Sequence, residues 1–128
     1  MKNDGVFSFL INDKTNMSRI VKIGSALSSE IRLKILLLLY NSPRTIVDIS
    51  NTLGLKNSTT IFHLDNLVKS DLVLVKTLPA KKGKVQLFTL NFTNLNISIN
   101  TNKEIKPDVF MDKLEKYINS KIDKLVLR

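Results

Sequence analysis

Apolar residues recur at helical spacing through the first third of the chain. Between residues 15 and 27 they lie three, four, seven and ten positions after the first, which predicts an amphipathic helix. From Glu30 to Tyr40 the chain is apolar nearly throughout, with Arg32 and Lys34 as the main charged exceptions. A helix that is apolar all round is typical of a buried position, so this segment is expected to be the central helix of the domain.

Residues 45–72 have the pattern of a helix-turn-helix. Pro43 ends the preceding helix, and Thr45 followed by Asp48 resembles a capping box at the start of the next. Gly54 supplies the left-handed residue that lets this first motif helix stop abruptly. The expected buried stripe of that helix is Ile46, Ile49 and Leu53.

The second motif helix is expected to begin near Asn57 or Ser58, since both are good capping residues. Its expected buried stripe is Ile61, Leu64 and Val68, with Leu67 beside them. Placing residues at 100° steps leaves an opposite, mostly polar face. That outer face holds Thr59, Phe62, His63 and Asn66.

A β-hairpin directly follows the helix-turn-helix. Apolar, β-branched residues predict strands over 72–78 and 85–90, separated by a turn at 79–84 with three Lys around Gly83. A helix-turn-helix with such a hairpin is a winged helix, which we assign to residues 15–91. The predicted fold class is therefore mainly α with a small β-hairpin (α+β).

Both ends of the chain extend beyond this domain. Val6–Ile11 favours a short strand in an N-terminal arm of residues 1–14, with a helical start as the alternative. The stretch 92–106 is either a linker or an extra strand. Residues 107–128 predict a helix, since Pro107 suits a helix start and an apolar stripe follows. The stripe is Phe110, Leu114, Tyr117, Ile118, Ile122 and Leu125.

This C-terminal stripe is longer than the small domain can cover. Pairing with the same helix of a second copy, together with the helix over 15–27, is the expected solution and makes the chain a homodimer. Packing back on its own domain is the alternative. A membrane-bound helix is disfavoured because acidic and basic residues are mixed along it.

The charge balance points to an acidic partner. The 128 residues carry 20 Lys and Arg against 11 Asp and Glu, a net charge of +9. The imbalance is greatest in residues 54–100, where six basic residues face two acidic ones. Such an excess favours nucleic acid first and an anionic membrane surface second, while simple solubility is the alternative explanation.

Several function classes are disfavoured. The chain has no Cys, so it has no disulfide, thiolate metal site or cysteine nucleophile. His63 is the single His and no carboxylate is spaced with it, which argues against a catalytic base or a metal ligand. No Gly-rich phosphate loop is present. We expect no enzyme activity, cofactor or metal, no membrane span and no signal peptide, and a cytoplasmic location.

The outer face of the second motif helix suits a DNA major groove. Ser58, Thr59, His63 and Asn66 can form hydrogen bonds with base edges or phosphates, and the helix start at Lys56 and Asn57 favours a phosphate. An ordinary amphipathic surface helix is the alternative.

Phe62 is the unusual residue on that face. It either packs against thymine methyl groups or is covered by a second subunit or the N-terminal arm.

The hairpin would contribute phosphate contacts. Lys81, Lys82 and Lys84 at its tip are expected to reach the DNA backbone or the adjacent minor groove, while a solvated turn is the alternative. Arg44 and Lys76 are weaker candidates for flanking phosphates. Catalytic residues are not expected.

Several segments of the chain resemble ArsR-like winged-helix transcription regulators, archaeal members in particular. The segment from Ala26 to Leu36 (ALSSEIRLKIL) resembles the opening of that domain, and 45–55 resembles its first motif helix. The segment 58–67 is similar to its recognition segment, including the His-Leu pair at His63. Over residues 20–90, the resemblance implies a homodimer that places one recognition helix in each half-site of duplex DNA.

The chain departs from that family at three places. Metal sensors of the family carry Cys in the first motif helix, where this chain has 49–52 (ISNT) without a thiol. Phe62 replaces a usually polar or basic residue, and Asp71 replaces a common Gly. The first departure argues against thiolate metal sensing, and the second leaves the base contacts open.

The resulting hypothesis is a sequence-specific regulator of transcription that binds double-stranded DNA. It would act as a homodimer on a pseudo-palindromic operator, with repression favoured over activation. The alternative is a winged helix used for protein–protein contact within a transcription complex.

Overall fold

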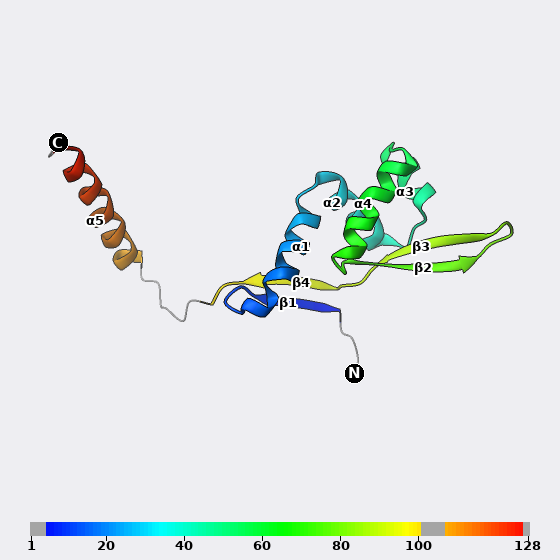
Figure 1. Ribbon diagram of the computed structural model, residues 1–128, viewed down its shortest axis with the longest axis horizontal. Helices are drawn as coiled ribbons and strands as arrows, with labels where there is room; N and C mark the ends of the chain where they lie inside the picture. Colours follow the sequence, from blue (N-terminus) through cyan, green and yellow to red (C-terminus); the bar gives the residue numbers. More distant parts are fainter. Residues whose placement is uncertain (1–4, 101–106, 127–128) are drawn as a thin grey trace.

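The computed structural model describes residues 5–100 and 107–126, and Figure 1 shows its elements in chain order. The helices are α1 (Met17–Leu27), α2 (Glu30–Asn41), α3 (Ile46–Leu53), α4 (Asn57–Lys69) and α5 (Pro107–Val126), with a short 3-10 helix η1 at Lys14–Asn16. The strands are β1 (Val6–Leu10), β2 (Val73–Pro79), β3 (Lys84–Leu90) and β4 (Asn94–Ser98). Helices α1–α4 and the β2–β3 hairpin form the winged helix predicted from the sequence.

The local signals that delimit the helices act largely as expected. The Thr45 hydroxyl accepts a hydrogen bond from the Asp48 N–H at 3.2 Å, and Gly54 ends α3 in the left-handed conformation with φ 66°. Helix α4 begins at Asn57, as expected, but neither Asn57 nor Ser58 caps it. Lys56, in extended conformation, is its N-cap and supplies no side-chain bond.

The expectation that α2 is buried all round is wrong for one of its faces. Ile35, Leu36 and Leu39 lie in the core, but Leu37 is 66% exposed and Tyr40 is 77% exposed. The helix contacts α1, α4 and β3, which all lie on one side of it. Leu33 is exposed as well, so an apolar strip of α2 remains on the described surface.

The buried stripe of α4 matches the predicted one at Leu64 and Leu67 but differs at its start. Thr60 is buried there, whereas Ile61 is 42% exposed. A buried hydrogen bond explains this difference: the Ser50 hydroxyl of α3 donates to the Thr60 hydroxyl at 2.8 Å. Because a buried hydroxyl needs a partner, this bond draws Thr60 inward and turns Ile61 toward solvent.

The hairpin is a regular antiparallel ladder that runs from the pair Val73–Leu90 to the pair Pro79–Lys84. Its turn is closed by a hydrogen bond from the Ala80 N–H to the Gly83 carbonyl at 3.0 Å. Its base is tied to the segment before α3, since Arg44 and Phe88 exchange two backbone hydrogen bonds of 3.0 and 2.8 Å. The hairpin is therefore fixed to the helix-turn-helix at its base and projects freely at its tip (Figure 1).

The N-terminal segment forms a strand that pairs with the stretch left open by the sequence. β1 and β4 are parallel, with Val6 opposite Asn94 and Leu10 opposite Ser98. The sheet packs against the start of α1, where the Arg19 guanidinium lies 5.0 Å from the ring centre of Phe9. A two-stranded sheet is marginal by itself, so this packing is what holds it in place.

Helix α5 carries its apolar residues on the surface. Every α5 side chain described, from 108 to 123, is exposed. Within the described residues, no helix has the length and hydropathy required to cross a membrane.

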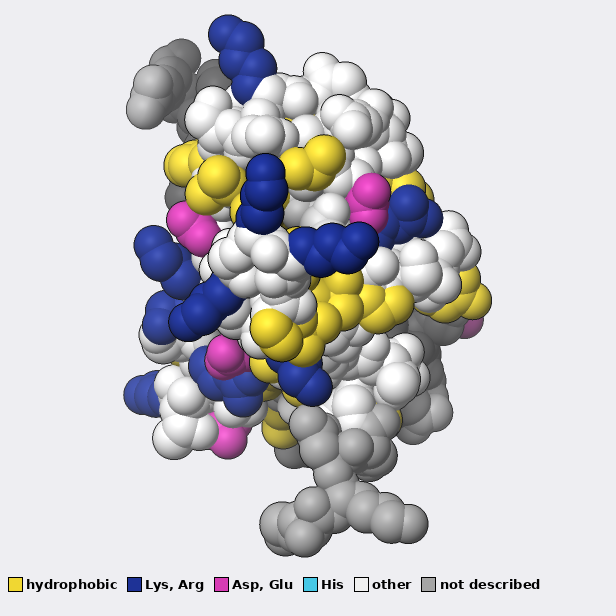
Figure 2. Space-filling model, turned by 90° about the vertical axis from the view of Figure 1, so that its right-hand side faces the viewer, with side chains coloured by type: hydrophobic (Ala, Val, Ile, Leu, Met, Phe, Trp, Pro, Cys, Tyr) yellow, Lys and Arg dark blue, Asp and Glu magenta, His cyan; other side chains and the backbone are white. Residues whose placement is uncertain are grey.

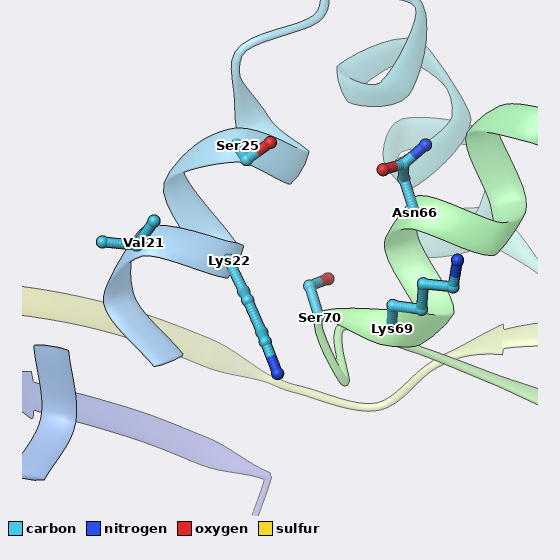
Figure 3. Close-up of a pocket in the computed structure, with 6 residues that line it drawn as sticks. All are labelled: Val21, Lys22, Ser25, Asn66, Lys69 and Ser70. Atoms are coloured by element: carbon cyan, nitrogen blue, oxygen red, sulfur yellow. The ribbon is translucent and has the colours of Figure 1, made fainter. Parts of the chain in front are cut away.

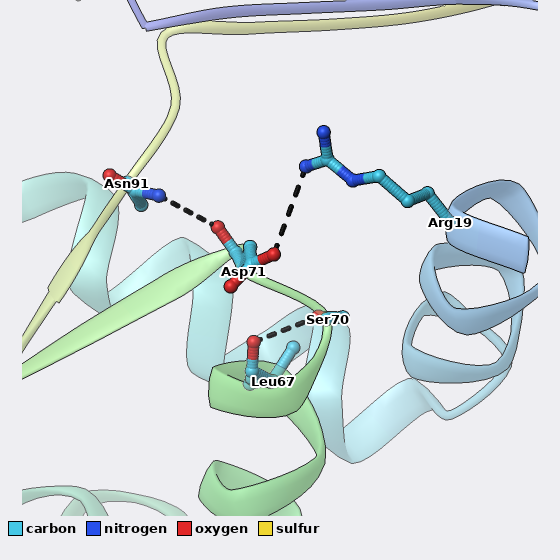
Figure 4. A network of polar contacts seen from close by, with 5 residues as sticks. All are labelled: Arg19, Leu67, Ser70, Asp71 and Asn91. Carbon is cyan, nitrogen blue, oxygen red and sulfur yellow. Dashed lines mark hydrogen bonds and ion pairs between the residues drawn. The ribbon is translucent and has the colours of Figure 1, made fainter. Parts of the chain in front are cut away.

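Asp71 closes α4 in an unusual backbone conformation (Figure 4). It is the one residue other than Gly with positive φ among those described, at 63°. Its carbonyl accepts a hydrogen bond from the Asn91 side chain at 2.9 Å, and its carboxylate lies 3.8 Å from the Arg19 guanidinium. The position therefore has the backbone geometry for which Gly is the usual residue.

We expect the Asp71→Gly variant to be more stable than Asp71→Ala by about 1 kcal/mol, because the left-handed conformation disfavours a residue with a Cβ. Both variants remove the exposed ion pair with Arg19, so their difference reports the backbone alone. Urea unfolding of the two proteins measures it. An Ala variant as stable as the Gly variant would contradict this explanation.

Candidate nucleic-acid interface

The outward face of α4 differs in part from the predicted one. Phe62 is 61% exposed. Thr59, His63 and Asn66 are only half-buried, toward the other helices, because the inward turn of Thr60 rotates the whole helix. The residues most exposed on this helix are Asn57, Ser58, Ile61, Phe62, Asp65 and Lys69. The outer face is thus less polar than predicted, and it includes an acidic residue that the sequence interpretation did not assign to it.

Arg32 holds α4 against the helices before it. Its Nε donates to the carbonyl of Ala26 at 2.7 Å and its Nη2 to the carbonyl of Ser25 at 3.0 Å. Its Nη1 lies 3.0 Å from Nδ1 of His63 on α4. Carbonyls at the end of a helix attract cations, so one guanidinium joins the end of α1, the start of α2 and the middle of α4. The sequence interpretation treated Arg32 only as a charged exception.

His63 is held in its neutral form. Burial lowers its pKa below the usual value, and the positive charge of Arg32 lowers it further. Since a guanidinium only donates hydrogen bonds, Nδ1 accepts and the ring proton resides on Nε2. The ring of Phe62 packs edge-on against this imidazole, with centroids 5.2 Å apart.

A depression lies between α1 and α4, beside the outer face (Figure 3). It has a volume of about 430 Å³ and is lined by Val21, Lys22, Ser25, Asn66, Lys69 and Ser70. The Asn66 amide donates to the Phe62 carbonyl at 3.0 Å, so one of its amide hydrogens is already used within the helix. Lys22 of α1 and Lys69 of α4 both line this depression. Nothing in the sequence connects these two lysines, because they belong to different helices.

The hairpin presents its cations to solvent. Lys81, Lys82 and Lys84 are exposed at the tip, and Lys76 is exposed along β2. Figure 2 faces the hairpin end of the molecule and shows Lys and Arg side chains around exposed hydrophobic ones. Arg44 is different: it is half-buried at the hairpin base, and its Nε is buried without a hydrogen-bond partner.

The expected dimerisation residues share the exposed surface of α5. Phe110, Leu114, Tyr117, Ile118 and Ile122 are between 41% and 61% exposed. The side chain of Leu125 lies outside the described residues. Spaced by four, three, one and four positions, the five form one face of the helix.

The described residues contain no cluster of three or more His, Asp or Glu able to hold a metal ion. The exposed residues of α4 and the hairpin offer hydrogen-bonding groups, apolar surface and positive charge.

Comparisons with known proteins find a family model that is similar to the helix-turn-helix region. The model of the bacterial regulatory proteins of the arsR family matches residues 29–74. An uncharacterized HTH-type transcriptional regulator of Methanocaldococcus jannaschii is 41% identical over 54 residues. These are 42% of this chain and 57% of that protein, so the match spans little more than half of its relative.

Solved structures share the fold. HlyU from Vibrio cholerae is 27% identical with a TM-score of 0.51, over 61% of this chain and 80% of its own. A possible ArsR-family regulator of Mycobacterium bovis, described as a homodimeric winged helix-turn-helix DNA-binding domain, is 23% identical with a TM-score of 0.52, over 60% and 68%. The similarity to the Mycobacterium bovis protein shows a shared fold and nothing more.

The lowered pKa of His63 gives a pH prediction. The unfolded chain takes up a proton at its usual pKa of about 6.5, whereas folded His63 resists protonation until lower pH. The contribution of the neutral ring is therefore complete above about pH 6.5 and is lost as pH falls through the folded pKa. The wild type should lose stability relative to His63→Gln as pH falls below about 6.5.

NMR measures this pKa directly, because the single His gives one ring resonance to follow. We expect a midpoint below 6.5, and a higher midpoint in Arg32→Met, which removes the neighbouring charge. A wild-type midpoint at or above 6.5 would show that the Arg32–His63 contact does not persist in solution.

Proposed function

We propose that this chain, whose residues 29–74 carry an ArsR-family helix-turn-helix, is a transcription regulator that binds specific duplex DNA as a homodimer. The observation that supports this proposal most strongly is the exposed outer face of α4 beside a hairpin that has three lysines at its tip. The family is one of regulatory proteins rather than enzymes. Repression by occupying an operator is the proposed mode, and the cytoplasm the proposed location.

The fit of α4 to a major groove is supported by its surroundings. Ser58 and Phe62 project from the face opposite the buried stripe, where they would meet base edges. Lys56 stands at the start of the helix, while Lys69 and Lys22 stand near its end. In this arrangement the lysines would contact phosphates and position the helix, whereas the residues between them would read the bases.

The other polar residues of α4 take secondary roles in this proposal. Thr59 and Asn57 would approach the backbone near the helix start, where N–H groups favour a phosphate. His63 and Asn66 would chiefly shape the outer face, through Arg32 and the Phe62 carbonyl respectively.

The hairpin would add sequence-independent affinity. Its tip lies away from the domain (Figure 1), which allows Lys81, Lys82 and Lys84 to follow the DNA backbone beside the groove occupied by α4. Lys76 and Arg44 would reach flanking phosphates.

Dimerisation through α5 is supported by its exposed apolar face. Five large apolar side chains at helical spacing would be covered if two copies paired along this helix. Two copies would then present their α4 helices about one DNA turn, or ~34 Å, apart, which calls for a pseudo-palindromic operator.

A protein–protein module in a transcription complex is the second candidate. The observation that favours it is the exposed apolar strip of α2, with Leu37 at 66% and Tyr40 at 77%. Such a module would not require DNA affinity, so a DNA-binding assay at low salt separates the two functions.

We expect the triple variant with Lys81, Lys82 and Lys84 changed to Ala to bind all duplexes more weakly. Each neutralised phosphate contributes about 0.9 to the slope of log affinity against log salt, so the slope should fall by up to ~2.7. Gel shifts over a salt series from about 50 to 200 mM measure it.

The matched control is Lys14→Ala, since Lys14 lies in η1 beside β1, far from the hairpin (Figure 1). It should leave the slope unchanged. A triple variant that alters sequence preference but not the slope would show that the tip does not contact phosphates. Absence of wild-type binding to any duplex at low salt would contradict the proposed function itself.

A further inference from the structure

We propose that Phe62 determines operator specificity by packing against the 5-methyl groups of thymines in the major groove. This inference rests on the proposed function and adds the feature of the bases that α4 recognises. It predicts an operator whose half-sites contain thymine at the positions facing this side chain.

The outer face of α4 exposes apolar side chains at positions where a DNA-recognition helix normally carries hydrogen-bonding groups. Phe62 is 61% exposed and its neighbour Ile61 is 42% exposed, both within the described part of α4. The 5-methyl group of thymine is the apolar feature that base edges present in the major groove. An aromatic ring on a helix in that groove can lose its contact with water only by packing there.

The polar residues predicted to read bases are largely engaged elsewhere. Nδ1 of His63 accepts from Arg32 at 3.0 Å, which turns the imidazole toward α2. The Asn66 amide donates to the Phe62 carbonyl at 3.0 Å. The polar residues of α4 that are exposed are Asn57, Ser58, Asp65 and Lys69, and Phe62 is the largest apolar contact surface among the exposed residues of the helix.

The ring of Phe62 is also held in place. It lies edge-on to the His63 ring at 5.2 Å and 69°, and His63 is itself fixed by Arg32. A side chain that is already ordered loses little entropy on binding, so its contacts convert more fully into affinity. This chain of contacts gives an exposed aromatic residue a defined orientation.

The charges around Phe62 favour DNA over a protein partner. Lys56 and Lys69 lie at the two ends of the same helix, and Lys22 and Lys69 both line the depression beside it. The exposed lysines of the hairpin add further positive charge on the surface that also carries Phe62. A duplex supplies both complements, phosphates for the lysines and methyl groups for the ring.

The test uses duplexes recovered by selection from random DNA, with deoxyuridine replacing one thymine at a time. Uracil pairs as thymine does and lacks only the 5-methyl group. At one or two positions in each half-site, wild-type affinity should fall about fourfold, the equivalent of ~0.8 kcal/mol for one buried methyl-sized group. Phe62→Ala should bind thymine and uracil duplexes equally at those positions.

Tyr40→Ala is the control, because it removes another exposed aromatic side chain, at 77%, outside α4. It should keep the wild-type ratio between thymine and uracil. Circular dichroism should show all three proteins folded, since both side chains are exposed.

Three results would overturn the inference while leaving DNA binding intact. They are equal wild-type affinity for every thymine and uracil duplex, an unchanged ratio in Phe62→Ala, and a change of oligomeric state in Phe62→Ala. The last would place the ring in an interface between copies. If the wild type bound no duplex at low salt, the proposed function would fail first and the inference with it.

Discussion

One half-buried guanidinium fixes the geometry on which the domain depends. Arg32 donates to two carbonyls at the end of α1 and contacts His63 on α4, so three helices meet at a single side chain. Because both carbonyls belong to the last turn of α1, the interaction stabilises that helix end as well. The contact with His63 requires a neutral imidazole, which the lowered pKa provides. The orientation of α4 relative to α1 and α2 therefore follows from one hydrogen-bonded junction.

A second polar contact decides which face of α4 points outward. The buried bond between Ser50 and Thr60 turns Thr60 into the core, and Ile61 and Phe62 toward solvent. The two contacts act together: Arg32 binds His63 and Ser50 binds Thr60, three positions apart on the inner side of the helix. The opposite surface is more apolar than its sequence pattern indicates. This is why we assign a large part of the base recognition to apolar contact and leave phosphate contacts to the lysines.

Much of the fold could be predicted from the sequence, because its helices, caps and hairpin are encoded locally. Gly54, Pro43 and the Lys-rich turn mark their elements without reference to the rest of the chain. The interactions that could not be predicted are long-range. Arg32 contacts a residue 31 positions away, and β1 pairs with β4 at a distance of 88 positions along the sequence. Hydrophobic periodicity also gives no reason to place the polar residue Thr60 in the core. A hydroxyl with a buried hydrogen-bond partner can nevertheless replace an apolar residue in the buried stripe of α4.

The central claim is that two copies of α4 read adjacent major grooves of one duplex. Selection of bound fragments from random DNA tests it most directly, since it reveals the sequence, symmetry and spacing of the site together. The account predicts enrichment of a pseudo-palindrome with half-site centres about 10–10.5 base pairs apart. Recovery of a single asymmetric half-site, or no enrichment over the starting pool, would contradict it.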